Sequence, residues 1–161
     1  MRPVVNISLL ILATSLFMAC NTSTSPPTAS EVLRYEPLKE AHVVRILDGD
    51  TIDVLIDGVK HRVRLFGVDT PERGEPCYNE ATERTRQLSG EVVRIEAGPR
   101  TEDRYGRLLF YLYTQSGESI DTQLIKEGLG TAWTRDGQHR DLLVKAEREA
   151  RNNKSGCLWA H

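Results

Sequence analysis

The sequence predicts an α+β domain that follows an N-terminal segment with a different character. Three observations support this fold class. Residues 41–161 contain five short strand-like runs, helical patterns lie between and after those runs, and an Asp57-Gly58 dipeptide joins two of them as a hairpin turn. A chain of 161 residues has room for one such domain plus an appendage. The pattern alone leaves open how the strands close.

The first three strands are expected in the first third of the domain. A β-rich run predicts the first strand over 42–47. Apolar residues at alternating positions of 52–56 predict a half-buried second strand. The third strand returns over 59–65, with apolar side chains on one face and three basic ones on the other: Lys60, Arg62 and Arg64.

The register of this hairpin gathers charged residues at one end. If Ile56 pairs with Val59 across the turn, Thr51 lies opposite Arg64 and Asp50 lies beside it. Just beyond, the chain reaches Asp69, Thr70 and Glu72. Hard oxygen ligands suit Ca²⁺ or Mg²⁺, and a guanidinium can hold a phosphate with two hydrogen bonds. These are the parts needed to attack a phosphodiester with water.

The remaining elements follow from periodicity and stop signals. A helix is expected from Pro76 to the Ser89-Gly90 stop, a fourth strand over 92–95, and a fifth over 108–113, with a loop from Gly98 to Gly106 between the two strands.

Two further helices are expected near the C-terminus. The first is a short one over 120–127 that Gly128 ends. The last covers about 138–153, with i,i+4 pairs Asp141/Lys145 and Glu147/Arg151. Its predicted apolar face consists of Leu142, Leu143, Ala146 and Ala150.

Several motifs, in their order and spacing, resemble the staphylococcal (thermo)nuclease family. They are DGDT at 48–51, Arg64 followed by VDTPE at 68–72, DRYGR at 103–107, the apolar pattern before Gly128-Leu129, and GCLW at 156–159. The resemblance covers about residue 41 to the C-terminus. It implies a five-stranded OB-fold barrel with about three helices.

The resemblance also implies a Ca²⁺ site. It assigns the metal ligands to Asp50, Asp69 and the carbonyl of Thr70, and gives Asp48 an orienting role. Taken alone, the two aspartates around Gly49 favour an ordinary turn over a metal site. An EF-hand is excluded, because apolar residues stand where its later ligands should be. The preference between Ca²⁺ and Mn²⁺ or Mg²⁺ stays open.

The same resemblance assigns the catalytic roles. Glu72 matches the general base or the residue that orders the attacking water, and Arg64 and Arg107 match the arginines that bind the phosphate. Tyr105 suits a stacking role. By composition alone, each arginine could equally be a surface ion-pair partner, and Glu72 an exposed acid. The family reaction leaves 3′-phosphorylated products.

The N-terminus is typical of an export signal. Residues 1–19 carry a short apolar run that ends before Cys20, which resembles a lipoprotein cleavage site with Cys20 as the lipidated residue. Ordinary secretion or an uncleaved anchor are the alternatives. Residues 20–40 are rich in Pro, Ser and Thr near their start and predict a flexible tether to a bacterial membrane.

Cysteine usage agrees with export. After Cys20 is assigned to lipidation, Cys77 and Cys157 remain as an even pair that could form a disulfide in an oxidising compartment. Two separate thiols are the alternative.

Other function classes are poorly supported. The net charge of −2 argues against a strongly basic nucleic-acid binder, without excluding a nuclease. The four histidines lack the spacing of zinc ligands, no serine forms a nucleophile elbow, and no Walker-type loop indicates NTP use. Two positions depart from the family pattern: Cys77-Tyr78-Asn79 replaces a common Tyr-Gly, and Asp121 replaces a usual Asn.

We therefore expect an exported, monomeric, Ca²⁺-dependent nuclease that cuts DNA, and RNA as well, with little sequence preference and a preference for single strands. The main alternative is a non-catalytic OB-fold lipoprotein that binds nucleic acid or a protein partner in an envelope complex. A structural envelope lipoprotein is a third hypothesis.

Overall fold

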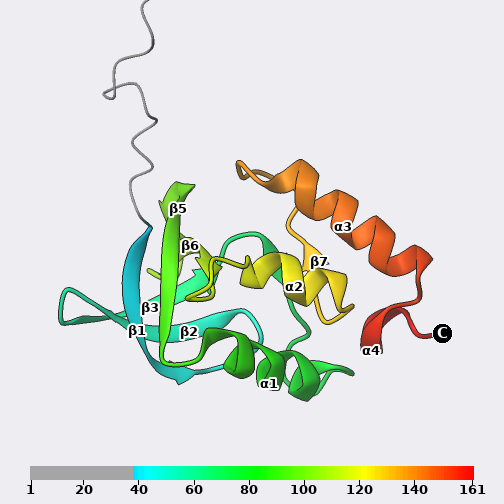
Figure 1. Ribbon diagram of the computed structural model, residues 1–161, viewed down its shortest axis with the longest axis horizontal. Helices are drawn as coiled ribbons and strands as arrows, with labels where there is room; N and C mark the ends of the chain where they lie inside the picture. The colour runs from blue at the N-terminus through cyan, green and yellow to red at the C-terminus, as the bar shows by residue number, and fades with distance from the viewer. Residues whose placement is uncertain (1–37) are drawn as a thin grey trace, which may run out of the picture. The chain divides into compact units, whose positions relative to one another are not determined.

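The computed structural model describes residues 38–161, in which five strands form a closed barrel (Figure 1). Around the barrel the strands follow the order β1-β2-β3-β6-β5, and β3 pairs with β6 in parallel whereas the other neighbours are antiparallel. This confirms the predicted α+β class with a barrel like an OB-fold. The barrel strands are β1 (Lys39–Ile46), β2 (Thr51–Ile56), β3 (Val59–Leu65), β5 (Val92–Glu102) and β6 (Leu108–Tyr113).

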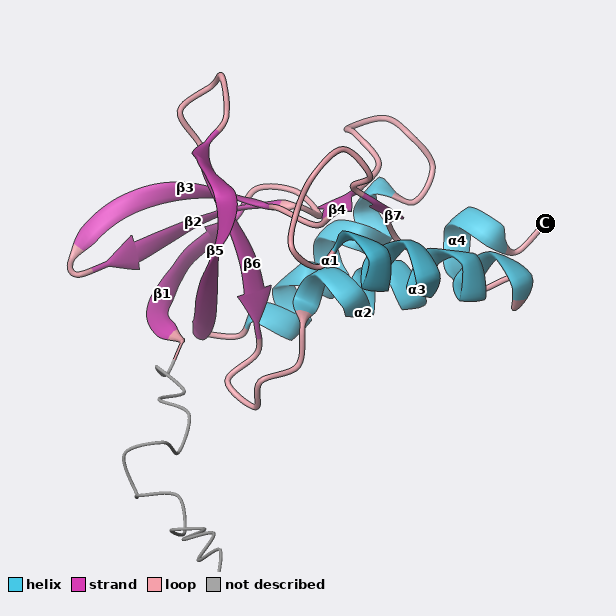
Figure 2. Ribbon diagram, turned by 90° about the horizontal axis from the view of Figure 1, so that it is seen from above, coloured by secondary structure: helices cyan, strands magenta, loops and turns pink. Residues whose placement is uncertain are grey.

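The helices gather on one side of the barrel, as Figure 2 shows. They are α1 (Tyr78–Ser89), α2 (Ile120–Lys126), α3 (Arg140–Asn152) and α4 (Gly156–Trp159). A small antiparallel sheet of β4 (Val68–Asp69) and β7 (Thr131–Ala132) lies among them. Within residues 38–161, none of these helices has both the length and the apolar content that a membrane crossing requires.

The predicted hairpin has the predicted register. Ile56 pairs with Val59 and Thr51 pairs with Arg64. Asp57 and Gly58 both adopt positive φ angles, 52° and 79°, which is the backbone conformation of the tight hairpin turns that favour Asp-Gly. The register therefore fixes Arg64 next to the DGDT turn.

The core runs continuously from the barrel to the helices. Inward-facing residues of β2 and β3 are fully buried, and so are the apolar residues of α2 that cover one opening of the barrel. The largest fully buried side chains are Tyr111, Ile52, Leu65, Leu112, Ile120, Leu124, Ile125 and Leu143. Since each such side chain stabilises the fold by about 1.5–3 kcal/mol on burial, this core fixes where the strand ends lie.

The predicted loop after the fourth strand is wrong in its first half. Strand β5 does not end near Ile95 but continues through Gly98 and Pro99 to Glu102, with an irregular register where the two residues lie. A Cβ atom at Gly98 would lie 2.5 Å from the Phe66 ring, so this glycine permits a close approach of strand and ring. Glycine and proline mark a barrel bend here, not a strand end.

The last helix differs from its prediction on its apolar face. Leu143, Ala146 and Ala150 are buried as expected, but Leu142 is 58% exposed, so its predicted core position is wrong. The buried positions share one stripe of the helix, and Leu142 lies about a quarter turn away from it.

The predicted ion pairs of α3 form in part. Glu147 and Arg151 pair at 2.6 Å. Asp141 pairs with Arg140 and not with Lys145, which lies nearer to Glu149.

Three short elements have no signal in the sequence pattern: β4, β7 and α4. A strand of two residues or a single helical turn is too short for a periodicity. At the other end, β1 begins at Lys39, three residues before the predicted strand. The predicted signal peptide, Cys20 and most of the predicted tether lie outside the described residues.

Candidate active site

One pocket of about 700 Å³ brings together five of the predicted site residues: Arg64, Asp69, Glu72, Tyr105 and Arg107. They come from β3, β4, the segment after β4, and the turn between β5 and β6. We call this pocket the arginine pocket. The other predicted residues, Asp48, Asp50 and Thr70, lie beside it in the DGDT turn and at the end of β4.

Asp50 is the buried link between the elements of the site. Its Oδ2 accepts hydrogen bonds from the backbone N and the Oγ1 of Thr70, at 3.0 and 3.1 Å. Its Oδ1 accepts one from Thr51 Oγ1 at 3.0 Å and lies 3.1 Å from Arg64 Nε. One carboxylate therefore holds the start of β2, the end of β3 and the end of β4 together.

Asp48 supports this arrangement from the turn. Its Oδ1 accepts a hydrogen bond from the backbone N of Asp50 at 3.1 Å, which is the local bond that an aspartate commonly makes in a turn. Burial and the charge of Asp50 raise the pKa of the Asp48 carboxyl. Asp48 thus orients the turn and does not contact Arg64.

Arg64 is held almost completely by the protein. Nη1 donates to the carbonyls of Leu65 and Val68, Nη2 donates to Asp69 Oδ1 at 2.6 Å, and Nε faces Asp50. Only 11% of its side chain is exposed. Of the five N–H groups of a guanidinium, this leaves one on Nη2 for a ligand.

Arg107 has more capacity for a ligand. Its Nε donates to Asp103 Oδ2 at 2.7 Å, and its Nη1 donates to Thr51 Oγ1 at 3.2 Å. Three of its N–H groups remain uncommitted toward the pocket. Two parallel hydrogen bonds to a phosphate are therefore possible from Arg107 without breaking its present contacts.

Tyr105 lies at the rim of the arginine pocket and is 68% exposed. The guanidinium carbons of Arg104 and Arg107 lie 4.7 and 5.6 Å from its ring centre. An exposed aromatic ring with cations beside it is suited to stacking on a base.

Glu72 is exposed and is held through its backbone. Its backbone N donates to Glu75 Oε2 at 2.7 Å. Partial burial and the negative charges of Asp50, Asp48 and Asp69 raise the pKa of Glu72, against the opposing effect of Arg64. A carboxylate with a raised pKa is a better proton acceptor, which suits a general base.

The donor set suits a hard cation. The carboxylates of Asp50 and Asp69 both reach Arg64, so they face one small volume next to the Thr70 backbone. Asp48 and Glu72 lie close to this pair, so four carboxyl groups gather near one guanidinium, an excess of negative charge that a divalent ion would offset. Within residues 38–161, no three His, Cys, Asp or Glu side chains form a cation site by themselves. A metal ion here would also need the Thr70 carbonyl and water.

Several residues of the arginine pocket were missed by sequence reasoning. Asp103 fixes Arg107 and lies inside the DRYGR motif, so the motif was a signal for it. Arg104 lies in the same motif. The others come from the strand end of β5 and the segment after β7, and nothing in their local pattern marks them: Arg100, Trp133, Arg135 and Asp136. Only the fold brings them to Tyr105.

Cys77 and Cys157 form a disulfide in the structure, with Cα atoms 5.6 Å apart, and the two residues are 80 positions apart in sequence. Cys77 is the N-cap residue of α1, five residues after Glu72, and Cys157 lies in α4. The bond therefore fastens the segment that follows Glu72 to the C-terminal end of the chain.

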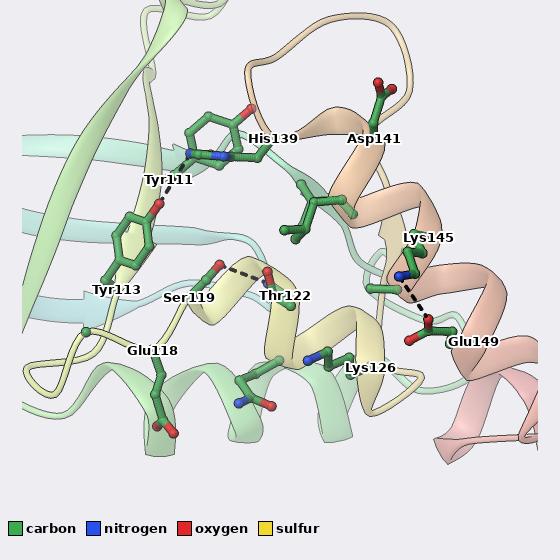
Figure 3. Close-up of a pocket in the computed structure, with 15 residues that line it drawn as sticks. Tyr111, Tyr113, Glu118, Ser119, Thr122, Lys126, His139, Asp141, Lys145 and Glu149 are labelled. Carbon is green, nitrogen blue, oxygen red and sulfur yellow. Dashed lines mark hydrogen bonds and ion pairs between the residues drawn. The ribbon is translucent and has the colours of Figure 1, made fainter.

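A second pocket, of about 760 Å³, lies between β6, α2 and α3 (Figure 3). Several of its polar side chains have structural partners. Ser119 caps α2 through the backbone N of Thr122, and Tyr113 and His139 both contact Glu96. It contains none of the predicted site residues, and none of its lining residues is an arginine. The arginine pocket is therefore the candidate active site.

Comparisons with known proteins give a consistent result. Residues 62–161 match the family model described as "Staphylococcal nuclease homologue". The chain is 34% identical over 128 residues to the thermonuclease of Staphylococcus hyicus, which covers 74% of this chain and 75% of that protein. It is 36% identical over 126 residues to the thermonuclease of Staphylococcus intermedius (73% and 74%) and 35% identical over 127 residues to the micrococcal nuclease of Shigella flexneri (73% and 72%).

Proposed function

Since the chain belongs to the family of staphylococcal nuclease homologues and is an endonuclease that hydrolyses phosphodiester bonds, we propose that it is Ca²⁺-dependent and cuts DNA and RNA with little sequence preference. One observation carries the proposal. Two arginines, a carboxylate of raised pKa and an accessible tyrosine ring share the same pocket, next to a pair of carboxylates. The alternative of a non-catalytic binding module does not agree with membership of this family.

The two arginines bind the phosphate that is attacked. Arg107 offers two hydrogen bonds to it, and Arg64 offers the remaining N–H of Nη2. Because both guanidiniums are already oriented by Asp103 and Asp50, they stabilise the negative charge that develops on the phosphate without reorganising.

Glu72 accepts the proton of the attacking water. Its side chain lines the arginine pocket together with Arg64 and Arg107, so a water held by Glu72 can approach the phosphorus opposite the leaving oxygen. Tyr105 stacks on a neighbouring base, and every base offers a face for stacking, which agrees with low sequence preference.

A calcium ion held by Asp50, Asp69 and the Thr70 carbonyl would neutralise charge on the phosphate. The support for this site is chemical: all three donors are hard oxygens, and their carboxylates exceed the local positive charge.

The first test is cleavage of a fluorescent single strand by the purified protein, with calcium and then with a chelator. Glu72→Gln should lower kcat by several orders of magnitude while strand binding remains, because only proton transfer is removed. Glu80→Gln, which changes an exposed acid in the first turn of α1, is the matched control. A Glu72→Gln protein as active as the wild type would exclude Glu72 as the base.

Export is also part of the proposal. It depends on the pattern of residues 1–20, and the disulfide fits an oxidising compartment. In cells grown with a labelled fatty acid, the wild type should incorporate the label and Cys20→Ala should not; an unlabelled wild type would exclude the lipid anchor.

A further inference from the structure

A smaller pocket of about 420 Å³ adjoins the arginine pocket at Glu72. Its lining includes Arg45 from β1, Asp48 from the DGDT turn, Glu72 and Arg73 from the segment after β4, and Tyr78 from the start of α1. Glu72 lines both pockets. We call the smaller one the Arg73 pocket. The nuclease function gives it no role so far.

The substrate is a polymer, so it must leave the site in two directions. With a phosphate at Arg64 and Arg107, one direction leads along Tyr105 and its neighbours in the arginine pocket. Since Glu72 also lines the Arg73 pocket, this pocket adjoins the catalytic groups. A strand that continued past Glu72 would meet Arg73 and its neighbours next.

Arg73 is available for such a phosphate. Within residues 38–161, no acidic side chain lies at ion-pair distance from Arg73. Its guanidinium carbon lies 6.0 Å from the ring centre of Tyr78. An arginine on an exposed loop, without an acidic partner among the described residues, can turn to an incoming phosphate without losing an ion pair.

Arg45 can contribute a second cation at low cost. It contacts Asp53 at 3.0 Å, but Asp53 is also held by Arg62 at 2.9 Å and by Lys60 at 3.1 Å. If Arg45 moves to a phosphate, the buried carboxylate of Asp53 keeps two basic partners. The three basic side chains around Asp53 therefore carry more positive charge than is required to balance its one carboxylate.

Tyr78 adds an aromatic surface to the two cations. It is half-buried, and its hydroxyl faces the carbonyl of Leu47 at 3.5 Å, so the ring is held in place at the pocket. A base that follows the phosphate can stack on such a ring, because stacking needs only a flat face and no particular donor pattern.

From this geometry we propose that the Arg73 pocket is a second nucleotide subsite, in which Arg73 and Arg45 bind the phosphate adjacent to the cleaved one and Tyr78 stacks on its base. The inference deepens the nuclease function proposed above and rests on it. The preferred substrate of this chain would then be a strand with at least two consecutive phosphates.

The test compares two substrates and one binding measurement. The substrates are a dinucleotide with a single phosphate and a 20-nucleotide single strand. Arg73→Ala should lower kcat/KM for the long strand about tenfold more than for the dinucleotide, since only the long strand has a second phosphate. In a Glu72→Gln background, which does not cut, the slope of log affinity against log salt should become shallower by about 0.7, one phosphate contact on a single strand.

Two matched variants control for charge and for packing. Arg86→Ala removes an exposed arginine of α1 that pairs with Glu83 away from the pocket, and it should affect both substrates equally and leave the salt slope unchanged. Tyr78→Phe keeps the ring and should bind the long strand as the wild type does, whereas Tyr78→Leu should bind it more weakly.

Three results would overturn the subsite: equal losses for Arg73→Ala on both substrates, an unchanged salt slope, or the same effects from Arg86→Ala. If the wild type cut neither of the two substrates, that result would instead contradict the proposed function. The binding measurement distinguishes the two cases, because it needs no turnover.

Discussion

Arg64 and Arg107 differ in the number of N–H groups that remain to bind a substrate. Most N–H groups of Arg64 already contact Asp50, Asp69 and two backbone carbonyls. Arg64 therefore holds the site together as well as offering a donor to phosphate. Arg107 keeps three free N–H groups. Both arginines were predicted from their motifs, but this division of roles was not, because it depends on where β4 and Asp103 lie.

Asp121 is the fully buried acid of the described chain whose position departs from the family pattern. Its two oxygens accept hydrogen bonds from the backbone N of Gly67 and of Leu112, at 2.8 and 3.1 Å. Burial raises the pKa of Asp121 to about 6 despite these bonds. The sequence showed the substitution but not the bonds, which join residues far apart in the chain.

The pH dependence of stability should reflect Asp121. Its pKa is raised in the folded state, so between about pH 4 and 6 the folded protein holds a proton that the unfolded chain has lost, and stability falls as the pH rises. Relative to Asp121→Asn, the free energy of unfolding of the wild type should drop by about 2–3 kcal/mol from pH 4 to pH 7. Urea unfolding at several pH values measures this.

Asp141→Asn, an exposed carboxylate of α3, serves as the control and should show no such trend against the wild type. A constant difference between the wild type and Asp121→Asn across this pH range would mean that Asp121 does not titrate there.

The segment between β4 and α1 is held in position mainly at its two ends. Residues 72–76 are all exposed, whereas Thr70 before them is buried against Asp50 and Cys77 after them is buried and bridged to Cys157. The segment itself contributes two hydrogen bonds between Glu72 and Glu75. The disulfide therefore acts on the position of Glu72.

Loss of the disulfide should lower both stability and turnover. In the Cys77→Ser, Cys157→Ser double variant, the free energy of unfolding should fall by about 4 kcal/mol, because the bridge closes a long loop. The kcat should fall by about tenfold or more with little change in KM, since Glu72 is displaced while the arginines stay in place. Urea unfolding and steady-state kinetics measure the two effects.

Each single cysteine variant should behave as the double variant does, since either one removes the bridge. A lower free energy of unfolding with an unchanged kcat would show that the bridge stabilises the domain but does not position Glu72.

The predictability of each element followed its length and turn chemistry. The β2–β3 hairpin was predicted to the residue, because alternation and an Asp-Gly turn determine register locally. The bend of β5 at Gly98 and the pairing of β4 with β7 were not, since they depend on Phe66 and on contacts between segments about 60 residues apart. Local pattern carries no information about such contacts.

For the whole molecule, charge distribution matters more than net charge. The chain carries −2 overall, yet the arginine pocket contains five arginines: Arg64, Arg100, Arg104, Arg107 and Arg135. Four carboxyl groups line the same pocket, and three of them, Asp69, Asp103 and Asp136, pair with its arginines. The composition could not reveal this concentration, which results from the fold.

Calcium should stabilise the whole fold, because Asp50 and Asp69 lie on elements that unfold together. At 100 times its dissociation constant, the ion should add about 2.7 kcal/mol to the free energy of unfolding and raise Tm by several degrees. Thermal unfolding with and without calcium measures this. Asp69→Asn should abolish the shift and Asp57→Asn, at the exposed hairpin tip, should keep it; a shift that survives Asp69→Asn would place the ion elsewhere.

The disulfide also makes the backbone from Cys77 to Cys157 a covalent ring. That ring includes the exposed Arg104 turn between β5 and β6, where a trypsin-like protease could reach the chain. One cut there would leave a single molecule, in which the piece with Arg64 and Glu72 stays bonded to the piece with Arg107. An enzyme cleaved once in this turn would therefore keep both parts of its site in one molecule.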